Sequence, residues 1–197
     1  MKKYPIKRFF YDVETTGVNW RRNSIHQLAA WMEVDGVVVE KLNLHIRPHA
    51  NADTDDSALA ISNVTKEQVM QYPTMELQFK VIKDTLAKYV DPFDKKDKFF
   101  FVGFKNASFD DDFFKKYFEL MGSKFFFYFF PSSIDVSVLA TQYLINVRHE
   151  MPSFKLHRVA KTLGIEVDDT RLHEADYDLQ LTREVYYVVS KFEESLF

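Results

Sequence analysis

The sequence predicts an α/β domain built on a mixed β-sheet, in which a three-strand meander is followed by strands that alternate with helices. Residues 6–13 are apolar and aromatic with a period of two, and residues 24–34 and 37–46 are strand-like runs separated by Asp35-Gly36, a strong hairpin signal. The later apolar runs change to helical spacing, interrupted by short aromatic stretches. We therefore expect a meander, further parallel strands, and helices on both faces of the sheet.

The second half of the chain supplies the alternating elements. Apolar residues at helical spacing, and helix stops such as Gly122 and Gly164, mark the helices. The short aromatic runs FFFVGF and FFFYFF are typical of buried strands. In chain order we expect a helix over 75–90, a strand over 99–104, a helix over 106–121, a strand over 125–130, and helices beginning at Ser132 or Ser133, at 154 and at 174.

Length and composition limit the class of protein. A chain of 197 residues suits one domain, here 1–197, and an apolar fraction of 46% excludes a disordered chain. The longest apolar run, residues 125–130, is far shorter than the roughly 20 residues that span a bilayer. The first ten residues lack a signal-peptide core. We expect a soluble, cytoplasmic protein with no membrane partner.

Two further features of the composition restrict the chemistry. The chain has no cysteine, which excludes thiolate nucleophiles and thiolate zinc sites, so any metal site must use oxygen or imidazole ligands. The net charge of -3 provides no global basic field. If the partner is nucleic acid, local lysines, arginines or bound cations must meet its phosphates.

The first acidic cluster ends the first predicted strand. Residues two apart along a strand point to the same face, so Asp12 and Glu14 present two carboxylates side by side. Two carboxylates this close repel each other, and a divalent cation would relieve the repulsion. A lone pair of this kind is more often a solvated strand end, so its weight depends on the other acids.

The second cluster is NASFDDDFF at 106–114. Successive helical residues are about 100° apart, so Asp110, Asp111 and Asp112 cannot all face one site. Asp110 is expected at the edge of the buried face, because Phe113 and Phe114 follow it one turn later. Asp111 and Asp112 are expected to turn toward solvent.

The third cluster is HEADYD at 173–178. Asp178 leads the apolar stripe of the last helix and is expected to point inward, whereas Glu174 and Asp176 are expected on the solvent side. His173 stands directly before this helix among acids. A histidine in such surroundings suits a base that moves a proton, although a surface residue at a helix start is an equal alternative.

Taken together, FYDVETTG at 10–17, NASFDDDFF and HEADYD resemble the three motifs of the DEDDh exonuclease superfamily. That superfamily includes the proofreading subunit of bacterial replicative polymerase, ribonuclease T and oligoribonuclease. The segments SIHQLAAW, ISNVT and FKLHRVAKTLGI also resemble it, and the resemblance covers about residues 6–190. One departure is Gly103, which stands three residues before Asn106 where many members have a glycine two residues before it.

The resemblance implies a ribonuclease H-like fold and a metal-dependent 3'–5' exonuclease. Two divalent cations, Mg²⁺ or Mn²⁺, would hold the scissile phosphate, and the product would be a nucleoside 5'-monophosphate. His173 matches the general base that takes a proton from the attacking water. The four metal-binding acids are matched by Asp12, Glu14, Asp110 and Asp178.

The resemblance also implies substrate contacts. Thr15, Thr16 and Gly17 resemble the loop that meets the terminal nucleotide, and Asn106 matches a residue near the scissile phosphate. Phe109 is a candidate for stacking on a base, with a place in the core as an equal alternative.

The ETTG form of the first motif favours DNA over RNA, so single-stranded or frayed DNA 3' ends are the expected substrate. The domain would act alone or beside a DNA polymerase. The alternatives are an exoribonuclease that trims RNA 3' ends or short oligoribonucleotides and, with less support because no motif acid is missing, a non-catalytic nucleic-acid-binding module.

Overall fold

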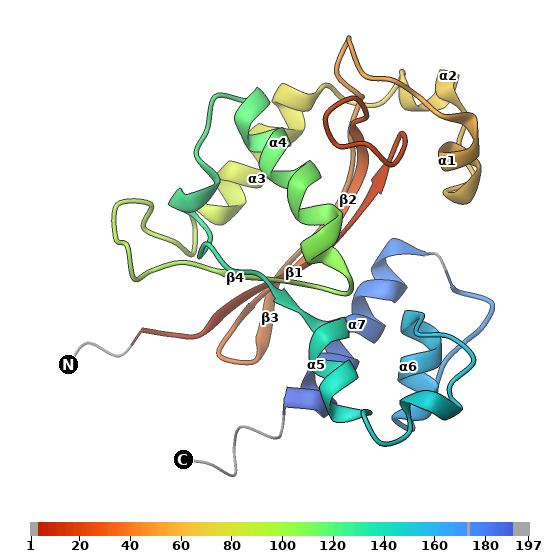
Figure 1. Cartoon of the computed structure of the whole chain (residues 1–197). Helices are drawn as coiled ribbons and strands as arrows, with labels where there is room; N and C mark the ends of the chain where they lie inside the picture. The colour runs from red at the N-terminus through yellow and green to blue at the C-terminus, as the bar shows by residue number, and fades with distance from the viewer. Residues whose placement is uncertain (1–3, 173, 191–197) are drawn as a thin grey trace.

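The computed structural model describes residues 4–172 and 174–190. Its centre is a five-stranded sheet with the order β3-β2-β1-β4-β5 (Figure 1). The first three strands form an antiparallel meander, and β4 and β5 add in parallel on the other side of β1. The strands are β1 (Lys7–Thr15), β2 (Ile25–Val34), β3 (Val37–His45), β4 (Phe100–Gly103) and β5 (Ile134–Asp135).

The predicted hairpin is confirmed. Asp35 and Gly36 join β2 to β3 with positive φ angles of 48° and 84°. A two-residue turn with positive φ at both positions matches the twist of antiparallel strands, and Asp-Gly adopts it at low steric cost. This turn sets the pairing in which Val34 lies opposite Val37.

The helices lie on both faces of the sheet, as expected (Figure 1). They are α1 (Asp56–Ile61), α2 (Lys66–Val69), α3 (Met75–Leu86), α4 (Asp110–Leu120), α5 (Val136–Tyr143), α6 (Leu156–Thr162) and α7 (Ala175–Val189). Short 3₁₀ turns occur at η1 (Asn106–Ser108), η2 (Phe125–Phe127) and η3 (Arg148–Glu150). Within the described residues, no helix is long and apolar enough to cross a membrane.

The alternation of β1 divides the core into two parts. Phe9, Tyr11 and Val13 enter an aromatic core beneath α3 and α4, where Phe9 and Phe114 lie 6.0 Å apart between ring centroids. Phe10 points the other way, into a core shared with α5, α6 and α7. The even-numbered residues of β1 therefore face α7, and this is the side on which Asp12 and Glu14 lie.

The prediction for residues 125–130 is wrong. The segment forms the turn η2, and Phe129 makes only an isolated bridge to Phe99. Phe125 and Phe129 are buried and stack on each other at 4.6 Å, whereas Phe126 is 55% exposed. A short apolar run has no period that separates a strand from a buried turn. The last strand is instead β5, and Asp135 is both its end and the N-cap of α5.

Candidate active site

Strand β1 presents Asp12 and Glu14 on one face. Their neighbours Tyr11 and Val13 are buried on the opposite face. Opposite them on β2 lie Ala29 and Gln27, so the pair occupies the middle of the sheet and not an edge. Helix α7 packs across this face of β1 and β2. The two carboxylates therefore lie on one face of β1, as their spacing predicts, and α7 packs on that face.

Helix α4 brings in Asp110. The chain leaves β4 at Gly103 and turns through η1 before α4 begins at Asp110, whose exposed fraction is 8%. A Cβ atom at Gly103 would lie 2.8 Å from the Cβ of Asn106, so glycine allows this turn to fold back onto the strand. The close turn places the first residue of α4 beside the end of β1.

Helix α7 brings in Asp178. Asp178 lies in the first turn of the helix and is half-buried, and its backbone N–H donates to the carbonyl of Glu174 over 2.9 Å. Ala175, Tyr177 and Leu179 are buried around it and fix the face that α7 turns to the sheet. The expected inward position of Asp178 agrees with this packing.

The four acids act on one another electrostatically. Burial raises the pKa of Asp12 well above its usual value, and the charges of Asp110, Glu14 and Asp178 raise it further. Burial likewise raises the pKa of Asp110, with contributions from Asp111, Glu14 and Asp135. Glu14, Asp110 and Asp178 therefore lie close enough to Asp12 for their charges to act on it.

The donors of this cluster fit a hard divalent cation, because all of them are carboxylate oxygens. A bound cation would also offset the repulsion that raises these pKa values. In residues 4–172 and 174–190, no three acidic or histidine side chains already stand in a ligating arrangement.

The expectation that Asp111 faces solvent is wrong. Its exposed fraction is 3%, and its Oδ1 accepts hydrogen bonds from the Tyr11 hydroxyl and from Asn106 Nδ2, the latter at 3.0 Å. Helical spacing alone places Asp111 away from Asp110. The side of the helix that it occupies is nevertheless buried, because it packs against Tyr11 on the far face of β1.

Asp176 is likewise not a solvent-side acid. It is half-buried, and its Oδ1 accepts a hydrogen bond of 2.6 Å from the indole N–H of Trp31 on β2. Glu174 does lie on the solvent side, where it pairs with Arg171 at 3.1 Å. The sequence carried no signal for the Trp31 contact, because the two residues are 145 positions apart.

The predicted substrate loop has a tightly held backbone. Thr15 donates from its hydroxyl to the carbonyl of Gly17, and the fully buried Thr16 donates to the carbonyl of Asp53. Any Cβ atom at Gly17 would collide with Asp55 and Asn23. The two hydroxyls thus shape the loop, and contact between residues 15–17 and a nucleotide stays a prediction.

Asn106 and Phe109 were also predicted to meet the substrate. Asn106 is fully buried, and its Oδ1 has no hydrogen-bond partner among the described residues. Phe109 is half-buried against the aromatic core, with its ring 5.0 Å from that of Phe113. Their contact with a substrate stays a prediction. His173, the predicted base, lies outside the described residues.

Ser62 is a residue that sequence reasoning did not select. Its hydroxyl donates to Oε2 of Glu14 over 2.7 Å, from the turn that follows α1. Asn63, the next residue, has a positive φ of 53°, which turns the chain at this point. The only signal was the resemblance of ISNVT to the family, and it did not identify the serine.

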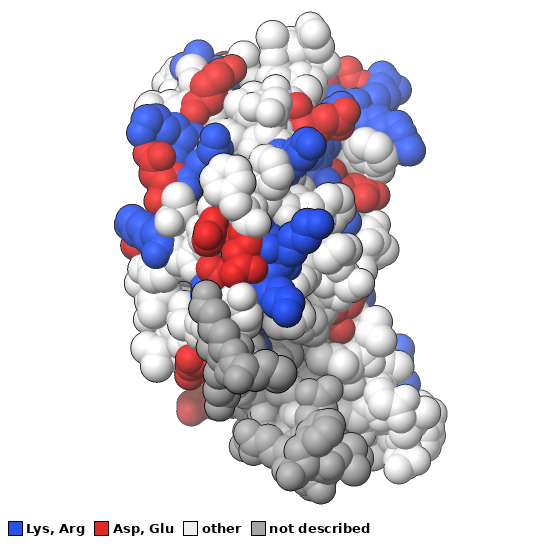
Figure 2. All heavy atoms as spheres, turned by 90° about the vertical axis from the view of Figure 1, so that its left-hand side faces the viewer, with Lys and Arg blue, Asp and Glu red and all other residues white. Residues whose placement is uncertain are grey.

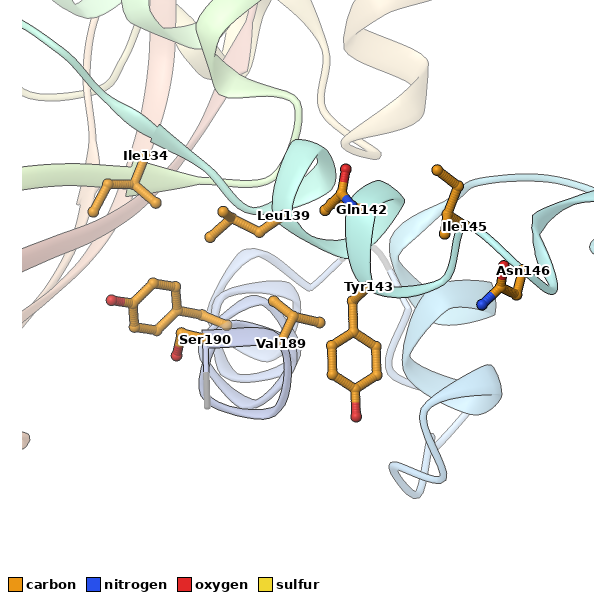
Figure 3. Close-up of a pocket in the computed structure, with 9 residues that line it drawn as sticks. Ile134, Leu139, Gln142, Tyr143, Ile145, Asn146, Val189 and Ser190 are labelled. Carbon is orange, nitrogen blue, oxygen red and sulfur yellow. The ribbon is translucent and has the colours of Figure 1, made fainter. Parts of the chain in front are cut away.

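An apolar pocket lies near the C-terminal end of α7. It has a volume of about 580 Å³ and lies between α5 and the end of α7, lined by residues that include Leu139, Tyr143 and Val189 (Figure 3). Its described lining includes none of the four acids. The pocket touches the opposite end of α7 from Asp178 and is not the candidate active site.

The surface shows no strong charge of one sign on the side drawn in Figure 2. Lysine and arginine side chains alternate there with aspartate and glutamate. In the structure as a whole, surface ion pairs include Lys80 with Asp84 and Lys88 with Glu40. The side therefore offers no continuous basic track for phosphates.

The fold and its motifs have known counterparts. A model of the exonuclease family matches residues 9–186. The PolC-type DNA polymerase III of Staphylococcus aureus (strain bovine RF122 / ET3-1) is 27% identical over 177 residues, which are 89% of this chain and 11% of that polymerase. The PolC-type enzyme of Mycoplasmopsis pulmonis is 26% identical over 176 residues, again 11% of its length. The chain thus spans a small part of these relatives.

Solved structures of an exonuclease have a similar fold. The crystal structure of E. coli exonuclease I in complex with a dT13 oligonucleotide superposes with a TM-score of 0.74 and 20% identity, covering 98% of this chain and 42% of that one. The metal-free form of its single-stranded DNA complex has the same TM-score. At this identity the likeness shows the fold, which is the ribonuclease H-like fold that the motifs imply.

Proposed function

This chain belongs to the exonuclease family, within the DEDD-type 3'–5' exonuclease superfamily, and from that premise we propose that it removes nucleoside 5'-monophosphates from the 3' ends of DNA. The observation that carries the proposal is the mutual electrostatic effect of Asp12, Glu14, Asp110 and Asp178, which come from β1, α4 and α7. This chain retains all four of the acids that the exonuclease motifs contain, and the loss of any one of them would have argued against a catalytic role.

The family generally uses divalent metal ions, and we assign two, Mg²⁺ or Mn²⁺, to this site. When bound they would polarise the scissile phosphate and stabilise the leaving 3'-oxygen. Asp12, Glu14, Asp110 and Asp178 would hold them, and Ser62 would orient Glu14 through its hydrogen bond. His173 would accept the proton of the attacking water.

Single-stranded or frayed DNA is the substrate that best fits the comparisons. The structural relatives include E. coli exonuclease I with dT13 and with dA16 oligonucleotides. Trp20 is half-buried beside the loop of residues 15–17, and the Arg21 guanidinium lies 4.0 Å from its ring. An aromatic ring paired with a cation suits a sequence-tolerant contact with bases and phosphates.

The sequence relatives connect the domain with replication. The PolC-type polymerases contain a matching stretch of 177 residues, so a proofreading role beside a polymerase is one setting for this activity. An exoribonuclease of RNA 3' ends is the second candidate, because the same acids and metal ions would suit cleavage of the phosphodiester bond of either DNA or RNA. A single domain over 1–197, free-standing or joined to others, stays a prediction.

The test offers DNA and RNA oligonucleotides of the same sequence, labelled at the 5' end, with Mg²⁺, Mn²⁺ or EDTA. We expect a ladder that shortens from the 3' end of DNA only with metal. Asp12→Asn should abolish it, and Asp112→Asn, on the less buried side of α4, should not. Cleavage in EDTA, or full activity of Asp12→Asn, would overturn the proposal, and preference for RNA would favour the second candidate.

A further inference from the structure

Asp111 and Asp176, which are not among the four predicted metal ligands, accept hydrogen bonds from aromatic side chains of the central sheet. Asp111 directly follows Asp110 on α4 and accepts a hydrogen bond from the hydroxyl of Tyr11. Tyr11 in turn directly precedes Asp12 on β1. The bond therefore joins the neighbours of two of the acids at the site.

Tyr11 is itself firmly placed. Its ring is 1% exposed and stacks on Phe101 with centroids 3.6 Å apart and an interplanar angle of 15°. Asn106 Nδ2 donates to the same Asp111 oxygen over 3.0 Å. The start of α4 is thus held to β1 through a buried oxygen that accepts two hydrogen bonds.

Asp176 makes the equivalent bond on α7. It lies two residues before Asp178 and accepts from the Trp31 indole over 2.6 Å. Trp31 is 7% exposed, and Lys41 Nζ lies 3.4 Å from the centroid of its ring. The start of α7 is therefore held to β2 by the Trp31 indole, whose ring is itself covered by Lys41.

The two donors occupy adjacent places in the sheet. Tyr11 is paired with Ala30 on β2, and Trp31 is paired with Phe10 on β1, so they stand one position apart and point to opposite faces. The bond to Asp111 fixes α4 on one face of the sheet, and the bond to Asp176 fixes α7 on the other. Both bonds lie within two residues of an acid from the predicted metal set.

We propose that Asp111 and Asp176 are positioning residues, which place the carboxylates of Asp110 and Asp178 relative to Asp12 and Glu14 and so set the affinity for the divalent cation. This inference rests on the proposed function of the four acids. Groups that orient metal ligands contribute to metal affinity about 10- to 100-fold, although they do not touch the metal. Ligands of a metal site tolerate displacements of only about 0.5 Å.

The test removes each donor: Tyr11→Phe keeps the ring and loses the hydroxyl, and Trp31→Phe replaces the indole with a smaller ring that has no N–H donor. Two matched controls remove a tyrosine hydroxyl farther along the same helices: Tyr117→Phe on α4, which loses the bond to Met75 O at 2.7 Å, and Tyr187→Phe on α7, which loses the bond to Glu33. Calorimetry measures Mn²⁺ binding to each folded protein, and thermal unfolding measures stability.

We expect Tyr11→Phe and Trp31→Phe each to weaken Mn²⁺ binding about 10-fold or more. The controls should lower the melting temperature while Mn²⁺ affinity stays within about 2-fold of the wild type, because they act on stability far from the acids. Asp111→Asn and Asp176→Asn should keep near-normal affinity, since the amide oxygen still accepts the bond. If a Phe variant does not fold, Asp111→Glu or Asp176→Glu replaces it, and we expect the same loss.

The outcomes separate this inference from the proposed function. A wild-type protein that binds no Mn²⁺ and cleaves nothing would remove the proposed function itself. If the wild type binds and cleaves while Asp12→Asn does neither, the site stands. Equal Mn²⁺ affinities of the donor variants and the tyrosine controls would then overturn the positioning role of Asp111 and Asp176.

Discussion

The hydroxyl of Ser62 donates a 2.7 Å hydrogen bond to Oε2 of Glu14, although the two residues are 48 positions apart in the chain. The bond attaches the turn after α1 to the acid at the end of β1. One carboxylate oxygen of Glu14 is therefore held by a hydrogen bond from a distant part of the chain.

Ser62→Ala should reduce the rate of metal-dependent cleavage about 10-fold, because Glu14 loses the donor that orients it. The apparent Mn²⁺ concentration for half-maximal activity should rise, while the KM for DNA should change little. Ser57→Ala, an exposed serine of α1, is the matched control and should behave as wild type. Equal kinetics of the two variants would exclude this role for Ser62.

Asp12→Asn should stabilise the metal-free protein at neutral pH. The pKa of Asp12 is raised by burial and by three neighbouring acids, so the stability of the folded state falls as pH rises from the ordinary aspartate pKa through the raised value. Asp12→Asn removes this pH-dependent loss of stability. For a protein of this size, each kcal/mol of added stability raises the melting temperature by roughly 2–4 °C.

Thermal unfolding in EDTA and in Mn²⁺ checks this expectation. Mn²⁺ should raise the melting temperature of the wild type and leave that of Asp12→Asn nearly unchanged. If Asp12→Asn has a lower melting temperature than the wild type in EDTA, repulsion among the acids does not destabilise the metal-free protein.

His26 should make the protein less stable in mild acid. Burial, with a smaller contribution from the charge of His45, lowers the pKa of His26 from 6.5 to about 4. Its side chain is fully buried, and neither ring nitrogen has a hydrogen-bond partner within the described chain. The unfolded chain takes up the proton near pH 6.5 and the folded protein only near pH 4.

The stability that depends on neutral His26 is therefore complete above about pH 6.5 and is lost as pH falls to about 4, on the order of 3 kcal/mol in total. Urea unfolding of wild type and His26→Leu at pH 7 and pH 5 measures it. The wild type should lose more stability than the variant between these values. His149→Leu, a change at an exposed ring, should leave the wild-type pH dependence intact.

Glu33→Gln should lower the free energy of unfolding, because it removes the charge from a buried carboxylate that is paired with two arginines. Glu33 is fully buried and pairs with Arg8 at 3.0 Å and Arg183 at 2.8 Å, which fastens the middle of α7 to the sheet. Removing one partner of a buried ion pair costs about 3 kcal/mol. Urea unfolding measures the change, and Glu40→Gln, in an exposed pair with Lys88, should cost much less.

Local rules account for a large part of the fold. Alternation along residues 6–13 predicts which face of β1 is buried, and Asp35-Gly36 predicts the hairpin, because both depend on residues adjacent in the chain. The aromatic run at 125–130 was predicted incorrectly. Its rings are apolar in either a strand or a turn, and only packing of Phe125 on Phe129 decides between them.

The sequence by itself predicted which residues would carry the chemistry: the alternation that pairs Asp12 with Glu14, and the motifs that select Asp110 and Asp178. Tertiary structure alone decided the contacts of Asp111, Asp176 and Ser62, whose partners Tyr11, Trp31 and Glu14 lie between 48 and 145 positions away. Helical spacing states how side chains are arranged around an axis, but not which side of that axis is covered. Only the packing of α4 and α7 on the sheet covers these sides of the helices, and it brings the Tyr11 hydroxyl to Asp111 and the Trp31 indole to Asp176.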